Sequence, residues 1–237
     1  MKILRFGKLY SNVNEKQEDY YIIKLSNIHF EQLMKLQTAV MESMERRDLY
    51  AGLTVGEIDN MLIDDGGLMV GAFVGDVMIA FYGIYFPGDN EDNLGRDVGI
   101  PKEDYHNVMH LEGAGVHPYY RGNSLQKILN SVCVAEAMKI RPVEHVCATV
   151  SPYNYASLDH LFAAKLYIKD MKKKYGDMLR YICYRNLCCE KEIIHDSIIN
   201  VESSDFNLQS KLLSERFIGF KIINSNKRCF IDFAKTK

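Results

Sequence analysis

The sequence lacks any apolar run near the roughly 20 residues that a membrane-spanning helix requires. Its opening stretch, Met1–Gly7, is too short for the apolar core of a signal peptide. An excess of positive charge is missing too, since 29 Lys and Arg residues stand against 31 Asp and Glu residues, a formal net charge of −2. We therefore expect a cytoplasmic protein that binds neither nucleic acid nor a membrane.

Cysteine motifs are absent as well. No Cys-x-x-Cys pair occurs, and no cysteine stands beside a histidine at zinc-ligand spacing, so we expect no metal site. Most of the six cysteines lie in apolar stretches, where cysteine behaves as a small hydrophobic residue, and we expect structural thiols rather than nucleophiles. The adjacent pair Cys188 and Cys189 is the unusual feature.

The composition that remains is that of an ordinary globular protein. Apolar residues make up 47% of the 237 residues and charged residues 25%, and no internal repeat or low-complexity segment occurs. This length accommodates one large domain, or one domain with a small appendage.

The spacing of apolar residues predicts strands and helices in the order β-α-α-β-β-β-α-β-α-β-β. A capping box at Thr54 and Glu57 marks the start of the second helix, and Gly75-Asp76 marks the turn of a hairpin. We expect strands at 19–24, 68–74, 77–85, 108–116, 145–150, 167–173 and 179–184, and helices at 30–44, 55–63, 125–139 and 154–165.

Two segments stand outside this regular pattern. Residues 87–105 show no periodicity and carry six acidic residues against two basic ones, which predicts a long acidic loop. Beyond Cys189 we expect a weak helix at 206–213 and a hairpin of strands 217–223 and 228–234 around the turn Asn224-Ser225-Asn226.

The most informative stretch is residues 112–126, where a predicted strand leads through a tight turn into a predicted helix. The first backbone N–H groups of a helix have no intrahelical partner and lie at the positive end of its dipole, so they suit a pyrophosphate. Arg121 adds positive charge, and Gly122 permits close backbone approach. The competing interpretation is an ordinary capped turn. Gly113-Ala114-Gly115 is not a dinucleotide fingerprint, because the third glycine is missing.

This stretch resembles the GNAT superfamily of acyl-CoA-dependent N-acyltransferases. Their pyrophosphate loop reads Gln/Arg-x-x-Gly-x-Gly/Ala, and here the loop is Arg121-Gly122-Asn123-Ser124-Leu125-Gln126 after Val116-His117-Pro118. Ser124 and Gln126 depart from the pattern. Asn154-Tyr155-Ala156-Ser157 resembles the start of the family's next helix, and the resemblance covers about residues 19–187.

The resemblance implies a mixed α/β (α+β) fold, with a mostly antiparallel sheet that is splayed at its centre and has helices on both faces. It implies acetyl-CoA as co-substrate, with Asn154 and Ser157 near the pantetheine arm. The arm would pair with the backbone of Ala114, Gly115 and Val116. The expected domains are a GNAT-like domain at 1–189 and a helix and hairpin extension at 190–237.

Amine acylation needs a base, and Glu112 holds the position of the carboxylate base in many members. The competing interpretation is a glutamate in a surface ion pair, and His110 is the second candidate base. The tyrosine that protonates the thiolate in many members lies seven residues after the helix asparagine, where this sequence has Leu161. The run Lys172-Lys173-Lys174 would either contact the 3′-phosphate of CoA or form a solvated strand end.

Two functions follow from these features. The first is acetyl transfer from acetyl-CoA to a primary amine of a small molecule or peptide. The acidic loop would favour a positively charged acceptor. The second is a non-catalytic acyl-CoA-binding module, which Ser124 and Leu161 suggest. The tail hairpin alternates apolar residues, with Ile218, Phe220 and Ile222 on one face, so it needs a docking surface on its own domain or across a homodimer.

Overall fold

The computed structural model describes residues 2–63, 65–225 and 228–237 and divides the chain into two compact units. Unit 1 comprises Met1–Phe86 and Leu111–Pro142, and unit 2 comprises Pro87–His110 and Val143–Lys237. The chain thus leaves unit 1, returns to it for about thirty residues and leaves it again. The predicted boundary between residues 189 and 190 stays a prediction, and the whole tail lies in unit 2.

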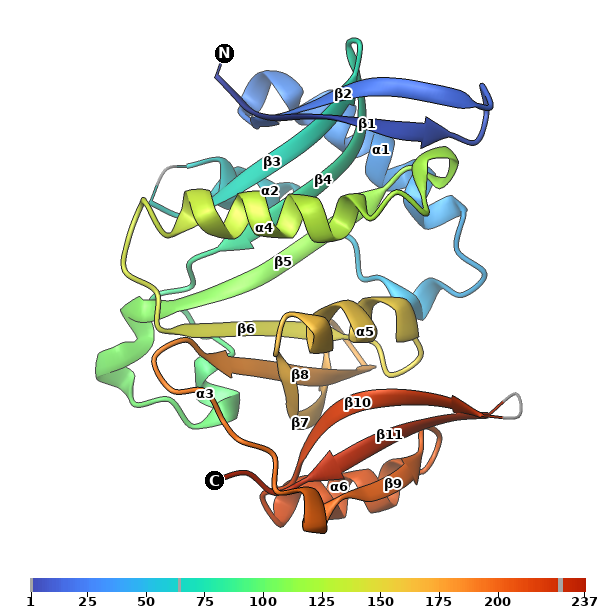
Figure 1. The fold of residues 1–237 in the computed structure, drawn as a ribbon. Helices are drawn as coiled ribbons and strands as arrows, with labels where there is room; N and C mark the ends of the chain where they lie inside the picture. The colour runs from blue at the N-terminus through green and yellow to red at the C-terminus, as the bar shows by residue number, and fades with distance from the viewer. Residues whose placement is uncertain (1, 64, 226–227) are drawn as a thin grey trace. The chain divides into compact units, whose positions relative to one another are not determined.

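Unit 1 is built on a sheet in the order β1-β2-β3-β4-β5 (Figure 1). Its strands are β1 (Ile3–Ser11), β2 (Lys16–Lys24), β3 (Gly67–Val74), β4 (Val77–Tyr85) and the later part of β5 (Val108–Val116). The first four strands pair antiparallel in succession. The hairpin predicted around Gly75-Asp76 is confirmed, whereas β1 was not predicted.

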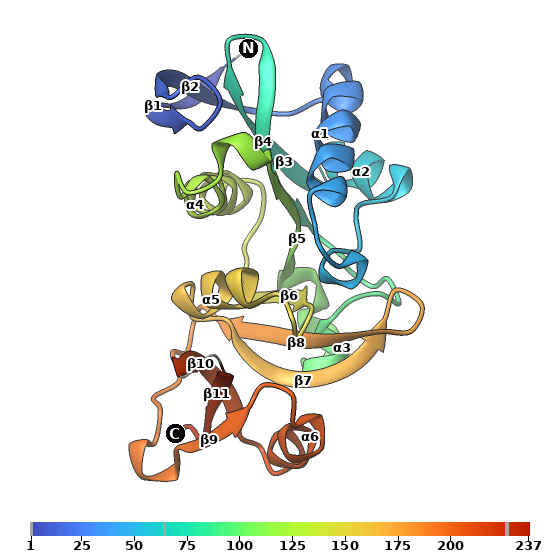
Figure 2. The same cartoon turned by 90° about the vertical axis from the view of Figure 1, so that its right-hand side faces the viewer.

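Helices cover both faces of this sheet. They are α1 (Phe30–Glu42), α2 (Val55–Leu62) and α4 (Leu125–Ala137), and Figure 2 shows α1 and α2 opposite α4. Leu33 of α1 and Ile58 of α2 are buried in one cluster with Phe81 of β4. The capping box is confirmed, because the Glu57 backbone N–H donates to Thr54 Oγ1 and the Thr54 backbone N–H donates to Glu57 Oε2.

Unit 2 contains the start of β5 and six further strands in the order β5-β6-β8-β7-β10-β11-β9. The β5 and β6 strands pair in parallel at Val108–His110, and the other pairs are antiparallel. Its helices are α3 (Gly95–Val98), α5 (Tyr155–Ala163) and α6 (Phe206–Ser214), and its further strands are β6 (His145–Val150), β7 (Tyr167–Lys174), β8 (Met178–Asn186), β9 (Ile199–Glu202), β10 (Ile218–Ser225) and β11 (Arg228–Ala234).

The tail packs on the rest of unit 2 rather than standing apart. Gly219 of β10 pairs with Ile168 of β7, and the Tyr181 hydroxyl donates to Gln209 Oε1 of α6 across 2.6 Å. The predicted alternation along 217–223 is wrong, because the pairing register shifts between Gly219 and Lys221 and leaves Phe220 as an extra residue. Strand β9 was not predicted, and Asn226 of the predicted turn lies outside the described residues.

The predicted acidic loop contains more structure than expected. It holds α3 and a 3₁₀ helix at Lys102–Asn107, and Leu94 and Tyr105 anchor it in a core with Cys147 of β6. The sheet is mixed and mostly antiparallel, as predicted. Within the described ranges, no helix combines the length and the apolar character needed to cross a membrane.

Candidate active site

The predicted base, Glu112, is half-buried on β5 and is followed by a break in the regular strand conformation. Gly113 has φ +68°, and a Cβ atom there would lie 2.6 Å from Leu53 Cδ1. A side chain at this position would meet both the left-handed backbone and the Leu53 side chain. A left-handed residue inside a strand bends it, which is a common feature beside active sites.

The residues after this bend form the edge of the unit 1 sheet. Because β5 is last in the strand order of unit 1, backbone groups of Ala114, Gly115 and Val116 that point away from β4 have no strand partner within that unit. Gly115 packs so closely on Phe81 that a Cβ atom would lie 2.5 Å from the ring. Such an edge can hydrogen-bond an extended ligand as if it were another strand.

A tyrosine that sequence reasoning missed belongs to the surroundings of Glu112. The Tyr50 hydroxyl donates to Gln37 Oε1 across 3.1 Å, and Gln37 also holds both backbone polar groups of Leu53. Burial, then the charge of Glu112 and then that of Glu57, raises the pKa of Tyr50. Tyr50 therefore stays a neutral phenol, and the local field is negative. No periodic signal marks it, because it lies between helices.

The predicted pyrophosphate loop joins β5 to α4 and leaves a row of donors without a protein acceptor. A single 3₁₀ turn, Pro118–Tyr120, precedes it, and the first intrahelical bond of α4 runs from the Ile128 N–H to the Ser124 carbonyl. Within the described part of the chain, the six backbone N–H groups from Gly122 to Lys127 have no hydrogen-bond acceptor. Gly122 has φ +86° and is exposed. These features suit a bound anion.

Arg121, the predicted charge of this loop, is exposed and lies against the end of α1. Its Nη2 donates to the Ser43 hydroxyl across 2.6 Å, and its Nε donates to the Val116 carbonyl across 3.4 Å. These neutral acceptors leave its positive charge uncompensated. The guanidinium is thus held by the end of α1 and the end of β5, and its binding role stays a prediction.

Asn123 and Ser124 have structural roles in the loop. The Asn123 side chain is engaged with the backbone of Tyr10 on β1, so only its backbone N–H belongs to the donor row. Ser124 is the N-cap of α4 with φ +56°, and its side chain makes no capping hydrogen bond. This is the position where the resembled pattern has glycine, and the left-handed backbone explains that preference.

Leu125 and Gln126 complete the predicted loop on the first turn of α4. The Leu125 side chain is buried and anchors the helix to unit 1, so its contribution is restricted to the backbone N–H. Gln126 is half-buried. The predicted residues from Glu112 to Gln126 are thus brought together in unit 1.

Asn154 and Ser157 lie in unit 2, at the start of α5. The Ser157 backbone N–H donates to Asn154 Oδ1 across 3.1 Å, so Asn154 caps its own helix. Leu161 is buried at 5% exposure, in the apolar interior of the same unit. The Tyr155 hydroxyl, on the same helix, is within hydrogen-bond distance of Ser203 Oγ, at 3.0 Å.

His110 does not fit the role of a base. It is only 2% exposed, and its Nε2 accepts the Leu94 N–H across 3.1 Å. Burial, followed by the charge of Lys174 and opposed by that of Asp97, lowers the pKa of His110 to about 3. A neutral imidazole that already holds a backbone N–H is a structural group.

Two lysines of the run on β7 pair with the acidic loop, and Lys172 and Lys173 are solvent-exposed. Asp97 lies 3.0 Å from Lys172 Nζ and 2.6 Å from Lys174 Nζ, and Lys173 pairs with Asp177. Burial raises the pKa of Asp97, but hydrogen bonds and charges of the two lysines outweigh it and lower the pKa overall. These contacts favour a structural role for Lys172 and Lys174, and they neutralise part of the acidic loop.

The cysteines match the structural expectation in three cases. Cys133, Cys147 and Cys183 are buried, and burial raises the pKa of each thiol, so none is a ready thiolate. Cys188 and Cys189 are exposed. Among the residues that the structure describes, no three His, Cys, Asp or Glu side chains group as a metal site would require.

No family model matches the sequence. No curated protein matches it either. Solved structures do match. The GNAT domain of S. lividans PAT is 16% identical, covers 77% of this chain and 97% of its own, and superposes with a TM-score of 0.53.

Two further structures resemble the chain to a similar extent. The ribosomal-protein-S18-alanine N-acetyltransferase of Escherichia coli is 13% identical, with 73% of this chain and 97% of its own covered and a TM-score of 0.53. Arabidopsis thaliana NAA60 in complex with acetyl-CoA is 11% identical, with 72% and 99% covered and a TM-score of 0.55. The chain therefore has the fold of the GNAT acetyltransferases.

Proposed function

We propose that this protein transfers an acetyl group from acetyl-CoA to a primary amine. The observation that carries the proposal is the donor row of Gly122–Lys127 beside Arg121, at the start of α4, in a chain with this fold. NAA60, which shares the fold, was solved with acetyl-CoA. Successive N–H groups, a helix dipole and a guanidinium together match the charge of a pyrophosphate.

The residues of unit 1 fit the chemistry of this co-substrate. The donor row and Arg121 would hold the pyrophosphate, and the strand edge at Ala114, Gly115 and Val116 would hydrogen-bond the amide groups of the pantetheine arm. Asn154 and Ser157, which the family resemblance implies near the pantetheine arm, stay a prediction. Acetyl-CoA supplies a thioester carbonyl and a thiolate leaving group.

Glu112 is the proposed general base. Nucleophilic attack requires a neutral amine, so a carboxylate must take the proton that an ammonium acceptor loses. Glu112 is half-buried and next to the bend at Gly113, where β5 passes from Glu112 to its proposed cofactor edge. Tyr50 is kept neutral by burial and by Glu112, and its hydroxyl donates to Gln37 Oε1, so it is not assigned as an acid. We assign no residue to the protonation of the leaving thiolate.

The acceptor is proposed to be a cationic amine of a small molecule or a peptide. The supporting charges are Glu57 and Glu112, which both act on Tyr50. The acidic loop supports the proposal less than expected, since Asp97 is paired with two lysines. A negative site concentrates positive substrates and favours their approach.

A second function, binding of acyl-CoA without turnover, rests on Leu161. Leu161 is buried in an apolar interior where many family members have the acid tyrosine. Solvent would then have to protonate the thiolate. In this alternative the donor row still binds acyl-CoA, and Glu112 has no catalytic role.

One assay separates the two functions. Thiol release from acetyl-CoA is measured over a panel of amines that includes polyamines, lysine-containing peptides and neutral arylalkylamines, while CoA binding is measured by thermal shift. Turnover with any amine, together with loss of binding in Arg121→Ala, supports the enzyme. Binding without turnover supports the second function. No shift with millimolar CoA contradicts both, since a ligand at a hundred times its Kd stabilises by about 2.7 kcal/mol.

A further inference from the structure

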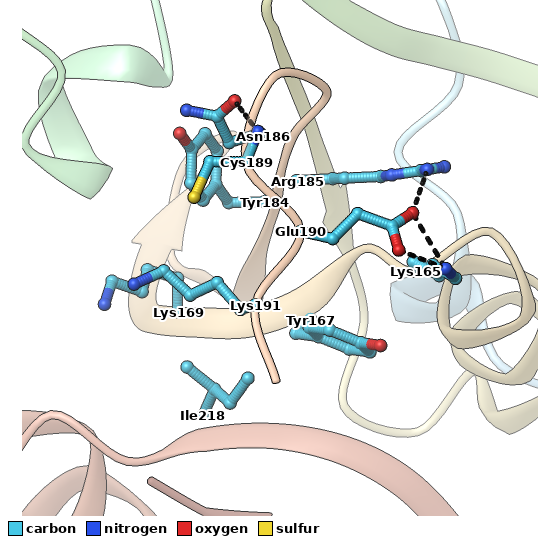
Figure 3. Close-up of a pocket in the computed structure, with 10 residues that line it drawn as sticks. All are labelled: Lys165, Tyr167, Lys169, Tyr184, Arg185, Asn186, Cys189, Glu190, Lys191 and Ile218. Carbon is cyan, nitrogen blue, oxygen red and sulfur yellow. Dashed lines mark hydrogen bonds and ion pairs between the residues drawn. The ribbon is translucent and has the colours of Figure 1, made fainter. Parts of the chain in front are cut away.

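Unit 2 contains a pocket whose lining includes none of the residues given a role in acetyl transfer above. It is lined by the connection between α5 and β7, by β7, β8 and β10, and by the segment that follows β8. Figure 3 shows the ten lining residues: Lys165, Tyr167, Lys169, Tyr184, Arg185, Asn186, Cys189, Glu190, Lys191 and Ile218. Four of these residues are cations and one is a carboxylate. The pocket belongs to unit 2 alone.

Part of the pocket lining is held in place by ion pairs and hydrogen bonds among the lining residues. Glu190 Oε2 lies 2.7 Å from Lys165 Nζ, and Glu190 Oε1 lies 3.2 Å from Arg185 Nη2. Asn186 Oδ1 accepts the backbone N–H groups of Cys188 and Cys189 at 2.7 and 3.0 Å. The segment after β8 is therefore pinned to the sheet, with Lys165 and Arg185 already partnered.

The remaining cations have no such partner. Within the described residues, no carboxylate lies at ion-pair distance from Lys169, Lys191 or Arg216. Lys169 is half-buried on β7. Burial, followed by the charges of Lys191 and Arg216, lowers the pKa of Lys169, so these cations are close enough to repel one another. An anion placed among them would relieve this repulsion.

The lining also contains an aromatic and an aliphatic residue. Ile218 is buried at 4% exposure, and Tyr167, which also lines the pocket, is half-buried. Figure 3 shows the ammonium ends of Lys169 and Lys191 directed to the same side, with the Tyr167 ring on the other. A ligand that fits both sides carries a charged group at one end and a planar ring at the other.

We infer that this pocket is a second binding site, for a ligand that joins a phosphate or diphosphate group to a planar ring. Lys169 and Lys191 bind the phosphate, and Tyr167 and Ile218 contact the ring. Arg216, which follows α6 and does not line the pocket, adds positive charge near Lys169. The inference is independent of the proposed acetyl transfer, since no residue of unit 1 contributes to it.

The test uses ADP as the probe, with adenosine and inorganic pyrophosphate as partial ligands, titrated calorimetrically into the full chain at low salt. We expect ADP to bind more tightly than pyrophosphate and adenosine to bind least. The double variant Lys169→Gln/Lys191→Gln should weaken ADP binding tenfold or more. Lys173→Gln is the matched control on the same strand, because Lys173 is exposed and paired with Asp177.

Arg121→Ala distinguishes this pocket from the loop of unit 1. If Arg121→Ala weakens ADP binding and the double lysine variant does not, ADP binds at the loop and the inference is wrong. Equal binding of adenosine and ADP would also overturn it. A second measurement needs no variant: ADP should protect Lys169 and Lys191, but not Lys173, from an amine-reactive reagent, as read by mass spectrometry. Absence of protection counts against the site.

Discussion

The side-chain amide of Asn123 makes two hydrogen bonds to the backbone of one residue, Tyr10. Asn123 Oδ1 accepts the Tyr10 N–H across 2.8 Å, and Asn123 Nδ2 donates to the Tyr10 carbonyl, also across 2.8 Å. The amide thereby stands in for a strand partner at the edge of β1. This contact ties the first strand of the chain to the loop that precedes α4.

Asn123→Ala should loosen that loop. We expect the free energy of unfolding to fall by about 1 kcal/mol, because the hydrogen bonds are exposed and each contributes modestly. CoA binding should weaken severalfold, since the donor row loses its anchor. Asn123→Asp is the intermediate case, because a carboxylate accepts from the Tyr10 N–H but cannot donate to its carbonyl. Urea denaturation and thermal shift with CoA are the measurements. Equal binding by all three proteins would show that the contact does not position the loop.

Ser124→Gly should stabilise the protein. Ser124 has φ +56°, a left-handed conformation that costs a residue with a side chain about 1–2 kcal/mol and glycine almost nothing. Glycine also raises the conformational entropy of the unfolded chain, which offsets part of this gain. We expect a gain of about 0.5–1 kcal/mol in urea denaturation. Ser131→Gly, at an exposed site inside α4, is the control, and its free energy of unfolding should fall by a similar amount. A loss in both variants would mean that Ser124 contributes a contact that outweighs its strain.

The elements that the sequence predicted are those whose signals are local. The capping residues Thr54 and Glu57 are three positions apart, and the turn before α4 lies within one strand-to-helix connection. The contacts that escaped prediction join distant segments: Asn123 with Tyr10, and Asp97 with Lys172 and Lys174. Neither charge nor periodicity marks such pairs in advance, because many other partners would have satisfied the same groups. Sequence reasoning thus predicted the turn before α4 and missed the contacts that hold it in place.

The buried His110 predicts a loss of stability in acid. Its folded pKa of about 3 is below the unfolded value near 6.5, so below pH 6.5 the unfolded state binds a proton that the folded state excludes. The contribution of the neutral His110 to the free energy of unfolding is therefore fully present above pH 6.5. It is lost between about pH 6 and pH 3, at up to about 1.4 kcal/mol per pH unit. The groups that face the ring are Lys174 and Asp97.

Two variants isolate this effect. His110→Gln keeps an acceptor for the Leu94 N–H and removes the titration, so its denaturation midpoint should change less between pH 6.5 and pH 4. His106→Gln alters an exposed histidine four residues earlier and should keep the wild-type slope. An unchanged slope in His110→Gln would show that other groups dominate the acid sensitivity.

Glu112→Gln should lower turnover about 100-fold, near the lower end of what general-base catalysis supplies, with little change in CoA affinity. The defect should shrink as the pH rises, because the amine loses its proton to solvent and no longer needs the base. Glu42→Gln, on the exposed face of α1, is the charge-matched control and should leave turnover unchanged. The check is a pH profile of thiol release for the three proteins. A defect that stays constant from neutral to alkaline pH would assign Glu112 a structural role.

The tail should prove to be part of the fold of unit 2, because its polar contacts with the rest of the unit are buried. Gln209 of α6 is completely buried; it accepts from the Tyr181 hydroxyl and donates to the carbonyls of Glu202 and Ser203. Gln209→Ala would leave all three groups unsatisfied, so we expect a loss of at least about 2 kcal/mol. Tyr181→Phe in the same chain removes one of those groups, so the double variant should be more stable than the sum of the two single losses predicts.

Deleting residues 190–237 is the larger test of the same idea. The deletion uncovers the edge of β7 that pairs with β10 at Ile168, and it leaves Tyr181 without its acceptor. Exposed strand edges pair with other chains, so we expect aggregation or a markedly lower melting temperature, while the loop from Arg121 to Gln126 stays in place because it belongs to unit 1. Thermal unfolding and light scattering decide it. The tail would be a dispensable appendage if the truncated chain were monomeric and had the melting temperature of the full chain, and if the free-energy losses of the Gln209 and Tyr181 variants were additive.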